Sequence, residues 1–161
     1  MPVPQRVREY LDSKNIPHEW VHHAQAFTAQ EVAHSVHISG KHLAKTVVLS
    51  ADDHLVMCVI PASHRLNLPE LRALLEVKHL GMLSEDELAK SFPDCELGAI
   101  PPLGNLYGME VWVDRVLAES EEIVFCAGSH VDCVRMKYSD YAALVTPHVG
   151  RFSDLWGTVA A

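Results

Sequence analysis

Lys45 is the residue whose position most suggests chemistry. It lies where a polar segment, 40–42, leads into the run 46–49, which is typical of a β-strand. An ammonium group at the mouth of a pocket can hold a phosphate, a carboxylate or a carbonyl oxygen by its charge. A lysine at the start of a strand is more often a solvated surface charge, so Lys45 becomes a candidate only if other segments join it.

A second candidate is the segment Glu96–Gly104, in which two glycines, Gly98 and Gly104, enclose Pro101 and Pro102. Proline restricts the backbone, and glycine leaves only small atoms at the surface. A rigid loop of this kind can aim backbone N–H groups at a developing oxyanion without reorganisation. A structural turn between two elements is the plainer interpretation. The segment does not match the glycine patterns that bind phosphates or dinucleotides.

The third candidate is Ala127–His130, which follows an apolar strand-like run at 123–126. Small residues at the end of a strand, followed by a histidine, are a common place for a ligand contact or a general base. A surface turn with an incidental histidine explains these four residues equally well.

Eleven histidines raise the question of a metal site, but their spacing gives it little support. His34 and His37 share a face of a predicted helix, yet HExxH and CxxC are absent and no carboxylate stands at a supporting position. No GxSxG motif marks a nucleophilic serine. The sequence therefore predicts no metal and no cofactor, and a reaction that depends on positioning and electrostatics.

Four cysteines, Cys58, Cys95, Cys126 and Cys133, occur without CxxC spacing. We expect reduced thiols that pack as small hydrophobic side chains. No cationic neighbour in the sequence marks a thiol with a lowered pKa, so we expect no redox role.

The chain carries 13 basic and 21 acidic residues, which leaves a net charge of −8. Binding to nucleic acid by charge alone requires many neutralised phosphates, so we expect no DNA binding and only brief contact with an RNA end. No apolar run approaches the ~20 residues of a membrane helix, and the first residues do not resemble a signal peptide. We therefore expect a cytoplasmic protein that does not bind a membrane.

Hydrophobic periodicity predicts that helices come first along the chain and that strands follow them. A helix is predicted over 3–14, and a capping box formed by Thr28 and Glu31 predicts a second one. Two β-branched, apolar runs, 45–50 and 55–60, are separated by four residues and predict a β-hairpin.

The rest of the chain mixes helices and strands. Pro69 and a capping box of Ser84 with Glu87 predict two more helices. Strands are predicted at 20–21, 110–114, 123–125 and 133–138, and a short helix near Ser139. Short connections between strands favour an α+β fold over a doubly wound parallel sheet. We predict a single domain over residues 1–161, with a mixed, mostly antiparallel, barrel-like sheet flanked by helices.

Together these segments resemble the YbaK/ProX family of editing domains, which are related to the insertion domain of bacterial prolyl-tRNA synthetases. The resemblance extends from His22 to Phe152. It rests on four segments in the same order and spacing: Thr28–Ala33, Lys45–Val48, Gly98–Gly104 and Ala127–His130. The family implies an α+β fold and hydrolysis of the ester that joins a wrong amino acid to tRNA.

The resemblance also implies roles for individual residues. It makes Lys45, Gly98 and His130 the catalytic candidates. The substrate-binding candidates are Thr28, Ala99, Ile100, Pro101, Pro102, Gly128 and Ser129. We expect an aminoacyl-tRNA deacylase, and its amino acid stays open among alanine, cysteine and serine.

The expected partner is a mischarged tRNA, bound weakly and transiently because the chain is acidic, with an aminoacyl-tRNA synthetase or an elongation factor to assist. Two alternatives stay open. The same fold could serve as a non-catalytic ligand- or partner-binding module, because Lys45 and the glycine-rich segment would also bind a carboxylate or a nucleotide end. A metal-dependent hydrolase built on the histidines is the other.

Overall fold

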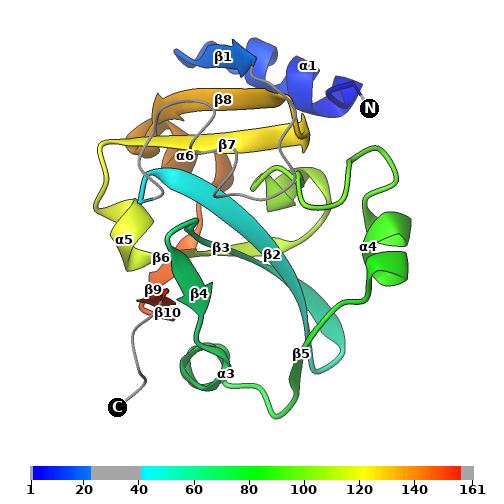
Figure 1. The fold of residues 1–161 in the computed structure, drawn as a ribbon, viewed down its shortest axis with the longest axis vertical. Helices are drawn as coiled ribbons and strands as arrows, with labels where there is room; N and C mark the ends of the chain where they lie inside the picture. The colour runs from blue at the N-terminus through cyan, green and yellow to red at the C-terminus, as the bar shows by residue number, and fades with distance from the viewer. Residues whose placement is uncertain (1, 23–40, 157–161) are drawn as a thin grey trace.

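The computed structural model describes residues 2–22 and 41–156 (Figure 1). The helices in these ranges are α1 (Gln5–Ser13), α3 (Leu68–Leu75), α4 (Glu85–Ser91), α5 (Arg115–Ala118) and α6 (Tyr138–Val145), with a 3-10 turn η1 (Gly104–Leu106). The strands are β1 (Glu19–His22), β2 (Leu43–Ala51), β3 (His54–Pro61), β4 (His64–Leu66), β5 (Leu80–Met82), β6 (Glu110–Asp114), β7 (Glu122–Ser129), β8 (Asp132–Lys137), β9 (His148–Gly150) and β10 (Ser153–Leu155).

Most of the described strands form one twisted sheet in the order β1-β8-β7-β2-β3-β6-β9, and β5 pairs with the far end of β2 (Figure 1). Strands β4 and β10 form a separate two-stranded sheet. The pairs β2–β7, β3–β6 and β6–β9 are parallel, and the other five are antiparallel. The predicted α+β class with a mixed, mostly antiparallel sheet is confirmed. Within the described residues the sheet is curled and its path is open.

The predicted hairpin is the β2–β3 pair at the centre of this sheet. Side chains alternate along a strand, and β2 uses both of its faces. Ala44 and Val48 join one hydrophobic cluster, whereas Val47 and Leu49 join another on the opposite face. Lys45 stands out in this strand because its side chain is exposed while most of its neighbours are buried.

Two of the helices follow the local sequence signals that predicted them. In α4 the predicted capping box is confirmed, because the Ser84 hydroxyl accepts the Glu87 N–H and the Glu87 carboxylate accepts the Ser84 N–H, both at 3.2 Å. In α1 the predicted apolar face is buried through Val7 and Leu11. Capping and periodicity involve residues within one or two turns, so the sequence predicts them well.

Several elements were not predicted: β4, β5, β9 and β10 have three residues each, and α5 has four. Segments this short carry no periodicity and form because a neighbouring strand pairs with them. Strand β7 also continues past its predicted end at residue 125 and reaches Ser129. The helix predicted from Thr28 lies outside the described residues. None of the described helices has the length and apolar composition needed to cross a membrane.

Candidate functional site

Lys45 lies near the start of β2, at the margin of the buried sheet. The parallel register pairs Leu43 with Val124 and Ala44 with Phe125 of β7. Lys45 is the next residue of β2, and its side chain is exposed. The local fold therefore presents a cation directly beyond a buried pair of strands.

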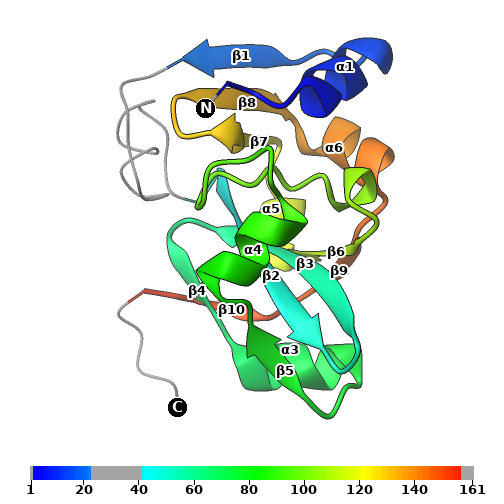
Figure 2. The same ribbon diagram turned by 90° about the vertical axis from the view of Figure 1, so that its right-hand side faces the viewer.

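The Gly98–Gly104 segment, called the glycine loop below, is hydrogen-bonded to the end of β7. The N–H of Gly128 donates to the carbonyl of Ala99 at 2.7 Å, and the N–H of Glu96 donates to the carbonyl of Gly128 at 2.9 Å. Figure 2 shows the chain after α4 running beside β7. The structure thus brings together the second and third predicted segments, the glycine loop and Ala127–His130, which we call the β7 turn.

The parallel pairing of β2 and β7 relates these segments to Lys45. Parallel strands run in the same direction, so the residues that follow the paired part lie beyond the same end of that pairing. Lys45 follows Ala44 directly on β2, and Gly128 lies three residues after Phe125 on β7.

His130 connects the β7 turn to the glycine loop. Its side chain is buried, and its ring Nε2 lies 2.6 Å from the carbonyl oxygen of Leu97 and 3.8 Å from the carboxylate of Glu96. A carbonyl oxygen only accepts, so Nε2 donates the proton. The backbone N–H of His130 also donates to the Glu96 carboxylate, at 3.2 Å. These contacts give His130 a positioning role.

The Glu96 carboxylate is held in its charged form. Burial raises the pKa of this group, but hydrogen bonds to the carboxylate, among them the one from the His130 backbone N–H, lower it more. The net result is a pKa below the usual value for glutamate. Glu96 is therefore an anionic acceptor that fastens the β7 turn at neutral pH.

Gly128 and Ser129 form the tightest part of the β7 turn. Gly128 has a φ of +93°, which favours glycine, and an added Cβ would lie 2.8 Å from Cγ of Pro4. The buried Ser129 hydroxyl accepts the N–H of Val131 at 3.2 Å. Ser129 thus stabilises the turn through its side chain.

The far end of the glycine loop is fastened by Tyr141. Its hydroxyl donates to the carbonyl of Pro102 at 2.6 Å. Burial raises the pKa of Tyr141 well above its usual value, so the phenol stays a protonated donor. Pro101, Pro102 and the side chain of Ile100 are buried, whereas Gly98 is exposed with a φ of +84°.

The backbone N–H groups of the two segments differ in whether they have an acceptor. Those of Ala99 and Gly128 both donate to backbone carbonyls, and the two prolines carry no N–H group. In the described part of the chain, no acceptor is bound to the N–H of Gly98 or Ile100. These two are the groups that could bind an oxyanion.

A hollow of about 430 Å³ lies on the outer side of this arrangement. Phe92, Cys95, Glu96, Leu97 and His130 contribute to its lining, which is mainly apolar. Lys45 does not line this hollow. The lining of this hollow therefore joins His130 with the residues just before the glycine loop, and Lys45 is not part of it.

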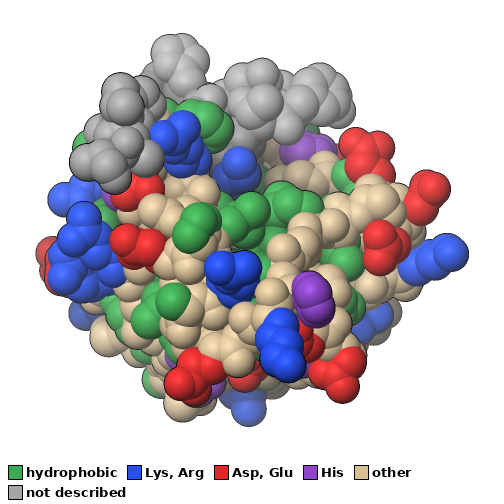
Figure 3. Space-filling view, turned by 90° about the horizontal axis from the view of Figure 1, so that it is seen from below, with side chains coloured by type: hydrophobic (Ala, Val, Ile, Leu, Met, Phe, Trp, Pro, Cys, Tyr) green, Lys and Arg blue, Asp and Glu red, His purple; other side chains and the backbone are tan. Residues whose placement is uncertain are grey.

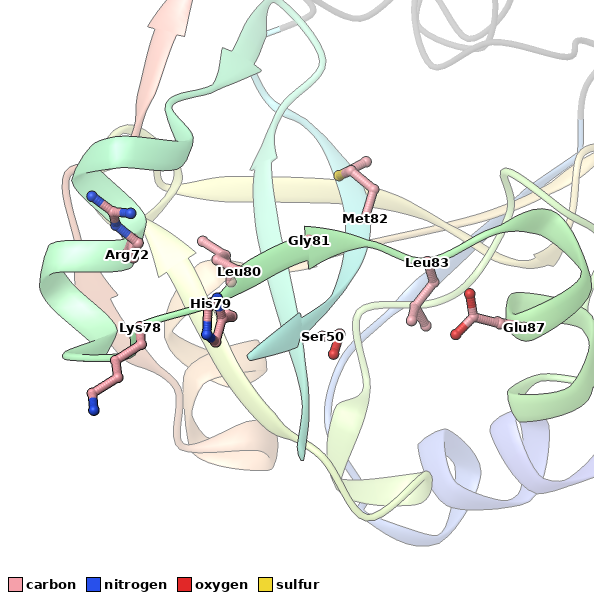
Figure 4. Close-up of a pocket in the computed structure, with 9 residues that line it drawn as sticks. All are labelled: Ser50, Arg72, Lys78, His79, Leu80, Gly81, Met82, Leu83 and Glu87. Atoms are coloured by element: carbon pink, nitrogen blue, oxygen red, sulfur yellow. The ribbon is translucent and has the colours of Figure 1, made fainter. Parts of the chain in front are cut away.

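A second hollow, of about 490 Å³, lies at the opposite end of β2 (Figure 4). Arg72, Lys78 and His79 line it together with Glu87 and Ser50. None of the predicted catalytic or substrate-binding residues is part of its lining.

Figure 3 shows one face of the molecule, on which hydrophobic side chains gather near the centre among charged groups of both signs. The described residues on that face form no continuous basic surface.

Some predicted residues cannot be placed. Thr28, His34 and His37 lie outside the described residues. Among the residues that are described, no group of three histidine, cysteine, aspartate or glutamate side chains is arranged to hold a metal ion.

Sequence reasoning missed Pro4 and Tyr141, which contact the site segments, and it included Glu96 in the second segment without giving it a role. Pro4 and Tyr141 are far from these segments in the sequence, and no local pattern marks them. Glu96 stands two residues before Gly98, and an acidic side chain beside a rigid loop was a usable signal.

Solved structures with the same fold are numerous. A scaffold protein from work on epitope backbone grafting by computational design aligns with a TM-score of 0.83 at 20% identity, covering 96% of this chain and 98% of that one. A protein described as a candidate trans-editing enzyme for prolyl-tRNA synthetase gives 0.84 at 19% identity, with coverage of 96% and 98%. A candidate signal-transduction protein from Marinobacter aquaeolei VT8 gives 0.74 at 22% identity, covering 95% of this chain and 31% of that one.

Sequence comparison is more specific than these similarities of fold. No curated protein sequence is similar enough to count as a match. The family described as the aminoacyl-tRNA editing domain matches residues 23–144, most of the chain and all three site segments. The chain therefore belongs to the aminoacyl-tRNA editing domain family, to which the YbaK/ProX resemblance also pointed.

Proposed function

We propose that the protein is a trans-editing deacylase, which hydrolyses the ester between a wrong amino acid and its tRNA in the cytoplasm. The observation that carries this proposal is that Lys45 directly follows the β2–β7 pairing on β2, while the β7 turn, hydrogen-bonded to the glycine loop, follows it on β7. Membership of the aminoacyl-tRNA editing domain family supports it. A protein of the same fold is described as a candidate trans-editing enzyme for prolyl-tRNA synthetase, which agrees with this substrate class.

In the proposed reaction Lys45 binds the ester carbonyl or the terminal ribose-phosphate oxygens through its charge. A water molecule attacks the carbonyl carbon, and the free hydroxyl of the terminal ribose orients it and relays its proton to the ribose oxygen that leaves. The N–H groups of Gly98 and Ile100 donate to the tetrahedral oxyanion. The carbon–oxygen bond to the ribose then breaks, and the ribose oxygen leaves with a proton. An aminoacyl ester is already activated, so stabilisation of this kind suffices without a nucleophilic side chain.

His130 acts in this scheme as a positioning residue. Its Nε2 is engaged by the carbonyl of Leu97, the residue before Gly98. By fixing that carbonyl, His130 orients the peptide plane that carries the Gly98 N–H. A misplacement of about 1 Å can cost on the order of 100-fold in rate. The orientation that His130 gives to the Gly98 N–H should therefore affect the rate of hydrolysis.

The remaining predicted contacts would shape the space for the amino acid. The short side chains of Ala99 and Ser129 and the rings of Pro101 and Pro102 are buried around the glycine loop and the β7 turn. A tight apolar boundary favours a small amino acid, although one methylene changes binding by only about 1–3 kcal/mol. Alanine, cysteine and serine are the candidates to compare, and Thr28 is a further candidate for substrate contact.

The tRNA itself is bound weakly and transiently in this proposal. The net charge of −8 opposes binding to a polyanion, and charges of both signs alternate on the face in Figure 3. An aminoacyl-tRNA synthetase or an elongation factor would therefore deliver the substrate.

A non-catalytic binding module is the second candidate function. The observation that favours it is that the same fold makes up 31% of a longer protein described as a candidate signal-transduction protein. Lys45 and the N–H groups of the glycine loop could bind a carboxylate or a nucleotide end without turnover. Turnover of an ester separates the two functions.

The test is a deacylation screen across tRNAs mischarged with alanine, cysteine and serine. On the best substrate we expect Lys45→Ala to lower kcat/KM by on the order of 100-fold. Its free energy of unfolding should change by less than about 0.5 kcal/mol, because the side chain is exposed. Lys137→Ala is the matched control, since Lys137 is an exposed lysine on β8 away from the site segments. Full activity in Lys45→Ala would remove Lys45 from the mechanism, and binding without hydrolysis would favour the module.

A further inference from the structure

Cys126 and Cys133 face each other across the β7–β8 ladder. They are direct partners in the antiparallel register, and their sulfur atoms lie 3.9 Å apart. Opposed residues on antiparallel strands have Cα atoms about 4.5–5.5 Å apart, within the range of about 4.4–6.8 Å that a disulfide spans. Both thiols are reduced in the structure. A disulfide could form here by side-chain rotation and a small adjustment of the two strands.

This pair encloses the β7 turn. The segment between the two cysteines, 127–132, contains Gly128, Ser129 and His130. The strand register shifts between Cys126 and Ser129, so the ladder is already irregular at that point. A covalent link between the strands would act directly on the part of the site that pairs with the glycine loop.

Cys126 also belongs to the face of the sheet that carries Lys45. Leu43 pairs with Val124, and Lys45 and Cys126 each lie two residues further along neighbouring parallel strands. Side chains two residues apart share a face. Cys126 and Lys45 therefore lie on the same face of two neighbouring strands, while the buried side chains of the glycine loop pack on the other face with Phe125 and Ala127.

The four cysteines differ in burial and in hydrogen bonding. Cys126 is half-buried, and a hydrogen bond from Cys133 lowers its pKa. Cys133 is buried, and the same interaction is the main cause that raises its pKa. Burial raises the pKa of Cys58 to about 12 and that of Cys95 to about 11, so those thiols are unreactive. A small oxidant would meet Cys126 first, with Cys133 in place as its partner.

We propose that Cys126 and Cys133 form a reversible disulfide that switches the editing site off in the presence of a hydroperoxide. This inference rests on the proposed function and adds a means of regulating the same site. The Cys126 thiolate attacks one peroxide oxygen, so that an S–O bond forms and the O–O bond breaks, with hydroxide or alkoxide leaving. The Cys133 sulfur then attacks Cys126. An S–S bond forms, the S–O bond breaks, and the sulfenic oxygen leaves as water with the thiol proton. The cysteines lose two electrons and the peroxide gains them.

Loss of activity follows from geometry. The two sulfur atoms must approach from 3.9 Å to about 2.05 Å, so both side chains rotate and the cross-link holds β7 and β8 in one fixed geometry beside the bulge. The two strands readjust around the cross-link, and the β7 turn shifts relative to Ala99, to which Gly128 is hydrogen-bonded. A displacement of about 1 Å at a catalytic group costs on the order of 100-fold in rate, so we expect kcat to fall at least about tenfold.

The experiment treats the full-length protein with hydrogen peroxide and follows thiol content, mass and deacylation together. We expect a loss of two thiols, a mass decrease of two hydrogens in the peptides that contain Cys126 and Cys133, and recovery of thiols and activity with dithiothreitol. Cys126→Ser and Cys133→Ala should each remain active after the same treatment. Failure of the disulfide to form, or an oxidised protein with unchanged kcat, would overturn the switch.

The reduced protein separates this inference from the proposed function. If it never hydrolyses any mischarged tRNA, the proposed function fails, whereas the disulfide still shows in the thiol and mass measurements. If peroxide inactivates Cys126→Ser as strongly as the wild type, inactivation comes from another residue and the switch is wrong.

Discussion

The two halves of the proposed site are built in opposite ways. The start of β2 presents Lys45 as an exposed side chain on a strand whose other residues hold it in place. The glycine loop and the β7 turn are mostly buried, and hydrogen bonds to Glu96, His130 and Tyr141 fasten them. A charge that must meet a ligand can stay mobile, whereas backbone donors act only if they are rigid before the ligand arrives. Substitutions in the first half should cost activity, and those in the second should cost stability.

The largest effect on stability is expected from Gly128→Ala. The residue has a φ of +93°, and its new Cβ would collide with the ring of Pro4, so both backbone strain and overpacking arise. We expect a loss of about 3 kcal/mol in the free energy of unfolding, measured by urea denaturation. Gly108→Ala is the control, because Gly108 also has a positive φ, +69°, but nothing lies within 4 Å of the added atom. A loss there of about 1 kcal/mol is expected, and equal losses would show that Pro4 does not restrain the β7 turn.

An intermediate effect is expected from Tyr141→Phe. This change leaves the carbonyl of Pro102 without its buried donor, at a cost of about 1.5 kcal/mol. The hydroxyl of Tyr138 makes no hydrogen bond to the described residues, so Tyr138→Phe serves as a control with little expected change. Thermal and urea unfolding give the comparison. If the two variants behave alike, the far end of the glycine loop is not fastened as we describe.

The smallest effect is expected from Glu96→Gln, and it should depend on pH. The pKa of Glu96 is lowered in the folded state, so its charged form adds stability above its unfolded pKa of about 4.3, and this stability is lost as the pH falls through the folded value. Because the carboxylate is partly exposed, we expect a difference of about 1 kcal/mol from wild type at pH 7. The difference should shrink toward zero in acid. A gap that stays constant from pH 7 to pH 3 would mean that the charge of Glu96 does not fasten the turn.

The distance in sequence between contacting residues explains which parts of the fold could be predicted. The β2–β3 hairpin and the Ser84 capping box were correct because both depend on neighbours in the sequence. The short strands β4, β5, β9 and β10 were missed because each exists only through a distant partner. Lys45, the glycine loop and the β7 turn were selected as segments from the sequence, but their arrangement depends on the β2–β7 pairing.

By itself the amino-acid sequence determined the capping box that begins α4, the central hairpin and the family, because caps, alternation and motif spacing are carried by residues close together in the chain. Only the tertiary structure decided which backbone N–H groups are already bonded, that His130 holds the carbonyl of Leu97, and that Cys126 faces Cys133. Those contacts depend on strand register, and register is set by how the whole sheet buries its side chains. Six residues separate the two cysteines in sequence without a recognisable motif, and one antiparallel ladder places their sulfur atoms 3.9 Å apart.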